Sequence, residues 1–405
     1  MVVAALIEFL IRGPLRNRGS ADLATPYVAS MRLARGQNPY DSADFISDWH
    51  AAGAETTLSL DASGQRPIYP PTTLVLFRPL TLIRWNRAFF LYRWLCSGAY
   101  ITLIIAFAQI AGDGWGSPTR LCFVCYAFML APMQTAIALG NPSAVAFLLA
   151  SIGLYLCWRD KELTAGILIA LSFCIKPTSA VGAVVAIALY RRFFAGTAFL
   201  CTTAIVALQA TVSIYKFGNI WWSDYQRNVA FLFGPQGAAS FTGSGRYYLI
   251  NLQPLAFTVL GDARFANYLA YAVTGLLALL WAVVCYLPTR LLRWNWLSVS
   301  SLQLLALLPM YQRNYNGMII VLFAACILGM RDVSRWLWIA AAAVGIPFLF
   351  PGTAMLERHA STGGPNSHVF LAAFLMPSLT WAVLCSILLA CAIAVQSRRA
   401  DTANI

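Results

Sequence analysis

Charged residues are scarce in this chain of 405 residues. Asp, Glu, Lys and Arg together make up 11%, whereas about a quarter of the residues are charged in an ordinary soluble protein. Hydrophobic residues make up 60%, and the mean hydropathy is +0.67. This composition excludes a soluble globular protein and indicates an integral membrane protein.

Cysteine pairs and clusters of metal ligands are also missing from the long polar segments. None of the ten Cys lies in the two longest polar loops, residues 12–93 and 216–267, so disulfides are not expected. Cys122 and Cys125 form a CxxC pair without a second ligand pair, which favours two buried thiols over a zinc or redox site. No Asp or Glu cluster has the spacing of metal ligands. We therefore expect neither a metal nor another cofactor.

Apolar runs fill most of the remaining sequence. A helix needs about 20 residues to cross a bilayer, and several runs are shorter, which points to broken helices lining a protein-enclosed cavity. The run Val2–Ile11 is shorter still: either the assigned start is late and half of a first helix is missing, or this piece lies at the interface. A complete first helix would make twelve spans. The eleven candidate spans are 94–112, 121–139, 143–158, 163–175, 178–190, 195–213, 266–287, 297–309, 316–330, 336–350 and 369–395.

Basic residues gather in the short connections on one face, which the positive-inside rule makes cytoplasmic. The two long polar loops, the turn Tyr311–Asn316 and the loop Pro351–His368 then face outward. Much of the net charge of +13 is explained by topology, so membrane lipids are expected neighbours and nucleic acid is not. We expect one multi-pass domain, residues 1–405, in the cell membrane. The basic residues are Arg120, Arg159, Lys161, Arg191, Arg192, Arg290, Arg293, Arg331, Arg335, Arg398 and Arg399.

Asp22 is the first candidate for chemistry. It follows the first apolar run directly and opens a stretch with helical spacing, so it is either the N-cap of that helix or a functional carboxylate. At the outer end of a first helix, near the membrane surface, it could act as a general base toward a hydroxyl.

Lys176 lies between two half-length apolar runs and precedes a proline. Ionisable residues at membrane depth are costly and indicate a functional site, while the alternative is a side chain that extends to the interface. Asn141, in LGNPS, is a similar but weaker candidate, because Asn-Pro turns between helices are common.

A third group of candidates lies at the turns that face outward. Tyr311, Gln312, Arg313 and Asn316 form a polar junction between two apolar runs, where Arg313 could clamp a phosphate. The remaining candidates are Tyr69 in the PIYPP segment, and Arg358 and His359 in the last outer loop.

Together these motifs resemble glycosyltransferase family 87, whose members are polytopic enzymes of the GT-C type. The resemblance runs from Asp22 through RGQNPYD, YPP, LGN and IKP to LLPMYQRNY. It implies an all-α membrane fold of 11 to 12 helices with a large extracytoplasmic first loop. It also implies inverting transfer of a sugar, often mannose, from a polyprenyl phosphate to a lipid-linked or cell-envelope acceptor outside the membrane.

The same resemblance implies roles for the candidates. Asp22 matches the position of the proposed base, and Lys176 and Arg313 would face the donor phosphate. Relatives often read YHRxYD where this chain has Gln312 and Asn316, which keeps an inactive GT-C-like protein as one alternative. Another is a transporter or flippase of an anionic lipid-linked substrate, although the paired broken segments typical of transporters are not evident.

Overall fold

The computed structural model of the protein describes residues 1–16, 21–53, 66–112, 114, 116–235, 237, 239–243, 246, 248–289, 294–330, 333–350 and 377–403. Within these residues the chain is helical, and its only strand-like pairing is an isolated antiparallel bridge between Leu249 and Arg313. This confirms the expected all-α structure.

Helices make up most of the described chain. The first part of the chain holds α1 (Val2–Arg12), α2 (Ala21–Arg35), α3 (Phe45–Ala51), α4 (Pro71–Phe77), η2 (Arg78–Leu82), α5 (Trp85–Ala108), α6 (Pro118–Met129), α7 (Ala131–Ala138), α8 (Pro142–Trp158), α9 (Glu162–Ile175), α10 (Pro177–Leu189) and α11 (Phe193–Tyr215). The second part holds α12 (Ile220–Phe233), α13 (Leu252–Leu260), α14 (Ala263–Trp281), η4 (Ala282–Tyr286), α15 (Trp296–Leu305), η5 (Asn314–Ile319), α16 (Ile320–Gly329), α17 (Arg335–Gly345), η6 (Ile346–Phe348) and α20 (Ser378–Ala403).

Four of the described helical segments are long and apolar enough to cross a membrane by themselves: Trp85–Ala108, Phe193–Tyr215, Ala263–Tyr286 and Ser378–Arg398. The pair α6 and α7 passes the same test together, with a bend of 40° between its halves. Six further apolar helices are shorter, among them α8, α9 and α10. The short helices that the sequence predicts around Lys176 are thus present, whereas the helix expected from residue 94 begins earlier, at Trp85.

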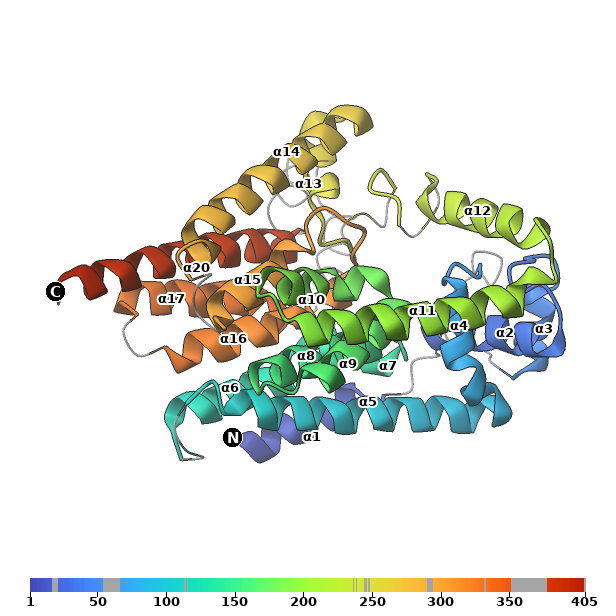
Figure 1. Cartoon of the computed structure of the whole chain (residues 1–405), viewed down its shortest axis with the longest axis horizontal. Coiled ribbons are helices and arrows are strands. Elements are labelled where there is room, and N and C mark those ends of the chain that lie inside the picture. The colour runs from blue at the N-terminus through green and yellow to red at the C-terminus, as the bar shows by residue number, and fades with distance from the viewer. Residues whose placement is uncertain are drawn as a thin grey trace, which may run out of the picture.

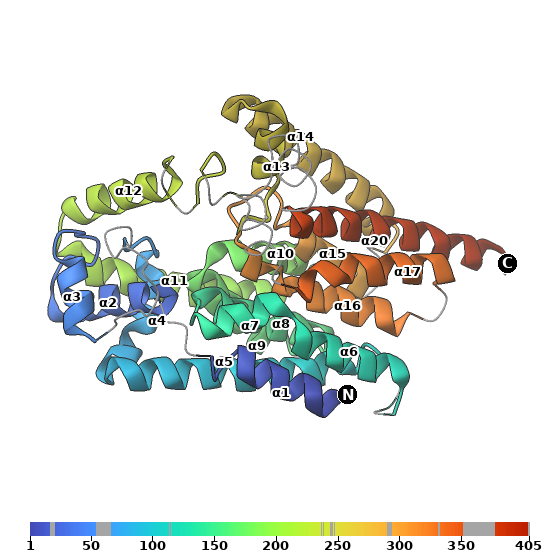
Figure 2. The ribbon, with the colours of Figure 1, turned by 180° about the vertical axis from the view of Figure 1, so that it is seen from behind.

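The molecule is elongated, and its two ends differ (Figures 1 and 2). The small helices α2, α3, α4 and α12 gather at one end, and the C-terminal end of α20 lies at the other. Long helices such as α5 and α11 run lengthwise between the ends. We call the first of these the α2–α12 end.

Close packing of α8, α9 and α11 forms the middle of the bundle. Gly166 in α9 lies so near α11 that a Cβ at this position would be 2.2 Å from the Ala195 backbone oxygen. Small residues of this kind let membrane helices approach closely, which replaces the hydrophobic driving force that lipid does not provide.

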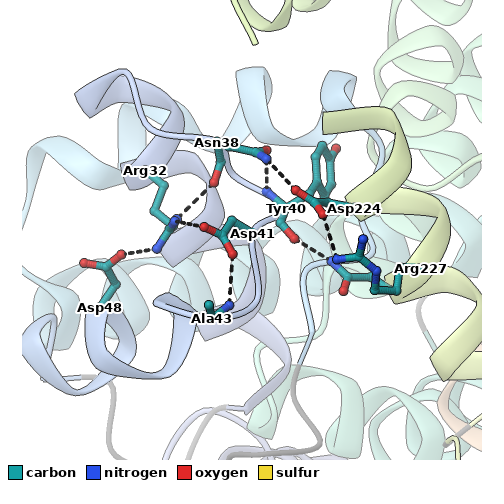
Figure 3. Close-up of polar contacts among 9 residues, drawn as sticks. Arg32, Asn38, Tyr40, Asp41, Ala43, Asp48, Asp224 and Arg227 are labelled. Carbon is teal, nitrogen blue, oxygen red and sulfur yellow. Dashed lines mark hydrogen bonds and ion pairs between the residues drawn. The ribbon is translucent and has the colours of Figure 1, made fainter. Parts of the chain in front are cut away.

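Polar contacts brace the α2–α12 end (Figure 3). Arg32 of α2 is buried, and its guanidinium donates to Asp48 of α3 at 2.5 Å and to the backbone oxygen of Asn38 at 3.1 Å. The Asn38 side chain in turn donates to Asp224 of α12 at 2.8 Å. The NPYD turn therefore joins α12 to α2 and α3.

A second chain of hydrogen bonds leads inward from α12. Asn228 Nδ2 donates to the backbone oxygen of Tyr40 at 2.8 Å. The hydroxyl of Tyr40, which is fully buried, donates to the backbone oxygen of Tyr69 at 2.7 Å. Asn228 Nδ2 also donates to the backbone oxygen of Pro67 at 3.1 Å, so Tyr40 and Asn228 both hold the segment that precedes α4.

Candidate active site

Asp22 lies in the first turn of α2, which begins at Ala21. An N-cap residue precedes the first helical residue, so Asp22 does not occupy the cap position. Its side chain is half-buried, and Oδ2 accepts a hydrogen bond of 2.7 Å from Asn141 Nδ2. The positive end of the α2 dipole favours an acidic group in this turn. The carboxyl group is therefore directed to the junction between α7 and α8.

Gly140 allows α2 to approach this junction. Its φ is +63°, in the left-handed region that glycine adopts without a steric cost. A Cβ at this position would lie 2.9 Å from Phe89 Cε2 and 3.0 Å from Leu23 Cβ. Because Leu23 is the neighbour of Asp22, the absence of a side chain at Gly140 sets how near Asp22 comes to α8.

The buried side-chain amide of Asn141 forms hydrogen bonds through both its oxygen and its nitrogen. Oδ1 accepts from the backbone N–H of Ser143 at 2.7 Å, which makes Asn141 the N-cap of α8. Nδ2 donates to Asp22 at 2.7 Å. The backbone oxygen of Asn141 accepts from Tyr92 at 3.0 Å. The residue predicted from the LGN motif is thus beside Asp22, with its orientation fixed by three hydrogen-bond partners.

Lys176 occupies the break between α9 and α10. A proline begins α10 and cannot donate a backbone hydrogen bond, so the last carbonyls of α9 need other donors. Thr72 Oγ1 donates to the oxygen of Cys174 at 2.7 Å, and Thr73 Oγ1 donates to that of Ile175 at 2.7 Å. The N-terminus of α4 therefore closes the end of α9 beside Lys176.

The side chain of Lys176 is directed into the bundle toward α8. Nζ donates to Ser143 Oγ and lies 5.4 Å from the centre of the Tyr315 ring. Its charge interacts with the opposite charge of Asp22 and the like charge of Arg313. Lys176 and Asp22 therefore contact neighbouring residues at the start of α8, Ser143 and Asn141, instead of Lys176 extending to the interface.

The polar junction 311–316 splits into two groups with different surroundings. Gln312 and Asn316 are buried: Asn316 Nδ2 donates to Gln312 Oε1 at 2.6 Å, and Gln312 Nε2 donates to the backbone oxygen of Thr178 at 3.0 Å. Their side chains join this junction to α10. Tyr311 and Arg313 lie nearer to Asp22, with which both interact electrostatically.

Arg313 keeps its positive charge in spite of its surroundings. Burial alone would lower the pKa of its guanidinium. The neighbouring Tyr315, Tyr311 and Asp22 oppose this effect, and the pKa of Arg313 lies above its ordinary value. The bridge to Leu249 holds the backbone of Arg313 in place.

Tyr69 completes the cluster. Burial raises the pKa of its hydroxyl well above the ordinary value, and the Asp22 carboxyl raises it further, while Arg313 lowers it. Tyr69 therefore stays a neutral hydrogen-bonding group within reach of both charges. Of the predicted site residues, Asp22, Tyr69, Asn141, Lys176, Tyr311 and Arg313 are thus brought together, Gln312 and Asn316 lie behind them, and Arg358 and His359 lie outside the described residues.

Ser143, Tyr315 and the pair Thr72 and Thr73 are residues that sequence reasoning did not single out. Ser143 and Tyr315 contact Lys176 directly, and the two threonines donate to the backbone of Cys174 and Ile175 just before it. Their signal in the sequence is weak, because a hydroxyl beside an apolar run is common, although Ser143 and the threonines follow Pro142 and Pro71 at helix starts. In the described part of the chain, no group of three or more His, Cys, Asp and Glu side chains could hold a metal ion.

A sequence model of glycosyltransferase family 87 matches residues 68–307, more than half of the chain. The chain belongs to this family. The expected family is confirmed, and the protein is a glycosyltransferase. Its described residues form an all-α structure with four helical segments that are long and apolar enough to cross a membrane. The matched range includes Tyr69, Asn141 and Lys176, whereas Asp22 and Arg313 lie outside it.

Among solved structures, the chain is similar to ArnT from Cupriavidus metallidurans, whose crystal structure contains undecaprenyl phosphate. The TM-score is 0.43 with 13% sequence identity, and the similarity covers 98% of this chain and 76% of that chain. No curated protein matches the sequence.

Proposed function

We propose that this family 87 glycosyltransferase transfers a sugar from a polyprenyl-phosphate donor, with mannose the first candidate, to a hydroxyl of a lipid-linked or cell-envelope acceptor. The observation that carries the proposal is that the Asp22 carboxyl and the Lys176 ammonium group contact Asn141 and Ser143, two residues of one helix start, and that both charges interact electrostatically with Arg313. A base for the acceptor and cations for a leaving phosphate are the two functions that this reaction needs.

In the proposed mechanism, Asp22 takes the proton of the acceptor hydroxyl while the hydroxyl oxygen attacks the anomeric carbon. The bond between that carbon and the phosphate oxygen breaks, and the phosphate leaves with the electron pair. Lys176 and Arg313 hold the charge that develops on it. Each well-placed charge contact of this kind contributes a factor on the order of 10²–10³ to the rate. Attack opposite to the leaving group inverts the anomeric configuration.

The site lies near the α2–α12 end, and this end is proposed to face outward. Support comes from the basic residues in the short connections, which the positive-inside rule assigns to the cytoplasm. Donor and acceptor would then meet outside the cytoplasm.

The test is to supply membranes that contain the protein with radiolabelled polyprenyl-phosphate mannose and to follow the label into lipid and polymer. Parallel reactions with GDP-mannose and with other polyprenyl-phosphate sugars identify the donor class and the sugar. We expect transfer from a polyprenyl-phosphate sugar, with the opposite anomeric configuration in the product. Transfer from the nucleotide sugar alone, in membranes without polyprenyl phosphate, would overturn the proposal.

A further inference from the structure

The N-terminal turn of α8, residues 140–143, contacts both sides of the proposed reaction site. Its Asn141 donates to the Asp22 carboxyl at 2.7 Å, and its Ser143 accepts from the Lys176 ammonium group. The two contacts are only two residues apart in the chain. Helix α8 therefore presents one partner to the base and one to the cation.

Neither partner is placed to bind substrate. Asn141 is 1% exposed and Ser143 is fully buried. Nδ2 of the Asn141 amide donates to Asp22, and Oδ1 accepts from the backbone N–H of Ser143. The sequence suggests Asn141 as a substrate-binding residue, but both polar atoms of its amide already have partners within the protein.

We propose that the α8 turn is a positioning element that fixes the separation between the base and the phosphate-binding cation. Asn141 holds Oδ2 of Asp22, which leaves Oδ1 as the oxygen that takes the acceptor proton. Ser143 holds the ammonium group of Lys176 on the side where the phosphate leaves. This inference rests on the proposed function and deepens it, because it assigns the geometry of proton transfer and of phosphate binding to a single helix end.

Asn141→Asp is the sharpest test, because Asp caps a helix about as well as Asn. The amide donor to Asp22 is lost, and a second carboxyl group so close to Asp22 repels its charge or shares one proton with it, which disturbs the base without altering the helix cap. A misplaced reacting group can cost on the order of 10²-fold in rate, so we expect kcat to fall by about 10- to 100-fold with the donor KM unchanged. The matched control is Asn295→Asp, which alters the N-cap of α15, where Oδ1 accepts from Ser298. It should leave transfer unchanged.

A double-mutant cycle shows whether Asn141 acts through Asp22. In an Asp22→Asn background, Asn141→Asp should reduce the residual rate little further, because residues that act as a unit are strongly non-additive. An equal fold-loss in both backgrounds indicates a general structural role and overturns the inference. So does a change confined to the donor KM, which would make Asn141 a substrate contact. If Asp22→Asn has no measurable rate, the kinetic constants of the single variant Asn141→Asp decide. A lower kcat with an unchanged donor KM supports the inference, and a change in the donor KM alone overturns it.

Ser143→Ala tests the other contact. We expect the donor KM to rise by about tenfold, the lower end of the range for a hydrogen bond to a charged group, with no further rise in a Lys176→Ala background. Ser151→Ala, which alters another buried serine of α8, is the control and should not change the KM. Near-normal constants for both Asn141→Asp and Ser143→Ala in folded protein would overturn the positioning role. If Asp22→Asn itself transfers at a near-normal rate, the role of Asp22 as base fails and the inference about Asn141 fails with it. If the unaltered protein transfers no sugar from any polyprenyl-phosphate donor, the proposed function fails instead.

Discussion

Asp22 combines partial exposure with a fixed orientation, as a general base requires. Its position inside the first turn of α2 allows a direct test, because Asn keeps the shape of Asp and can still face Asn141. Asp22→Asn should preserve folding and reduce kcat by roughly 10²-fold or more, the usual scale for removal of a general base. The measurement is transfer by purified protein, with the melting temperature as the check on folding.

A second carboxyl, with a purely local role, serves as the control for this prediction. Asp262 caps α14 and accepts from the backbone of Arg264 at 2.8 Å and of Phe265 at 2.9 Å. Asp262→Asn should therefore leave transfer intact, because Asn caps equally well. Near-normal transfer by folded Asp22→Asn protein would remove Asp22 from the role of base.

Lys176 and Arg313 are expected to bind the donor phosphate. Lys176→Ala and Arg313→Ala should each weaken use of the donor by about 1.5–3 kcal/mol, the range for hydrogen bonds to charged groups. Arg227→Ala is a matched control, because the Arg227 side chain is 68% exposed on α12 and pairs with Asp224. If both Lys176→Ala and Arg313→Ala keep the kcat and the donor KM of the unaltered protein, these cations do not bind the donor phosphate.

At the scale of elements, the site is made where helices break. The junctions α7–α8, α9–α10 and the segment before η5 each interrupt an apolar run, and each places polar groups at the same point. Irregular backbone at membrane depth is tolerated where protein encloses it. The threonines of α4 show how this is achieved at α9, because their hydroxyls satisfy the carbonyls that the break leaves without donors.

Gly140 controls the contact between α2 and the start of α8, and its replacement is expected to affect both stability and turnover. Gly140→Ala adds a Cβ at 3.0 Å from Leu23 Cβ and forces alanine into a left-handed conformation. We expect a stability loss of about 1–3 kcal/mol from backbone strain and a larger proportional loss of kcat, because α2 must move away together with Asp22. The measurements are thermal unfolding and donor-saturated turnover.

Gly261→Ala separates backbone strain from the clash. Gly261 has φ +68° at the end of α13, and a Cβ there meets no atom within 4 Å. This variant should show the strain alone and keep its kcat. If Gly140→Ala and Gly261→Ala lose equal stability and both keep full turnover, contact between α2 and the α8 turn does not control the site.

Several of these breaks can be predicted from the sequence, because a proline or an ionisable residue inside an apolar run is costly unless the helix is interrupted there. Lys176 and Asn141 are identified in this way. The grouping of Gln312 with Asn316 cannot be predicted, because it depends on the approach of residues 311–316 to Thr178 in α10. The sequence also places the start of α5 too late, at residue 94 instead of Trp85. The first turns of α5 contain Arg87 and Arg93, so they do not belong to the apolar run from which the span is predicted.

At the scale of the whole molecule, one basic residue of the short connections has a role beyond topology. Arg192 is buried and donates to Asp160 at 2.9 Å and to Glu162 at 3.0 Å, so it joins the α10–α11 connection to the α8–α9 connection. Because Arg192 has this structural role, its position alone does not indicate which side of the membrane it faces. The predicted orientation depends on the basic residues of the short connections as a group, and it can be measured directly.

Orientation is tested with single cysteines in a background without the ten native Cys. Asn219→Cys places a thiol just before α12, and Ser334→Cys places one just before α17. Because the positive-inside rule puts the connection before α17 in the cytoplasm, a membrane-impermeant maleimide applied to intact cells should label Asn219→Cys alone. After the membrane is permeabilised, both variants should react, which shows that each thiol is accessible. Labelling of Ser334→Cys alone in intact cells would reverse the orientation, and the proposed reaction would then take place on the cytoplasmic side of the membrane.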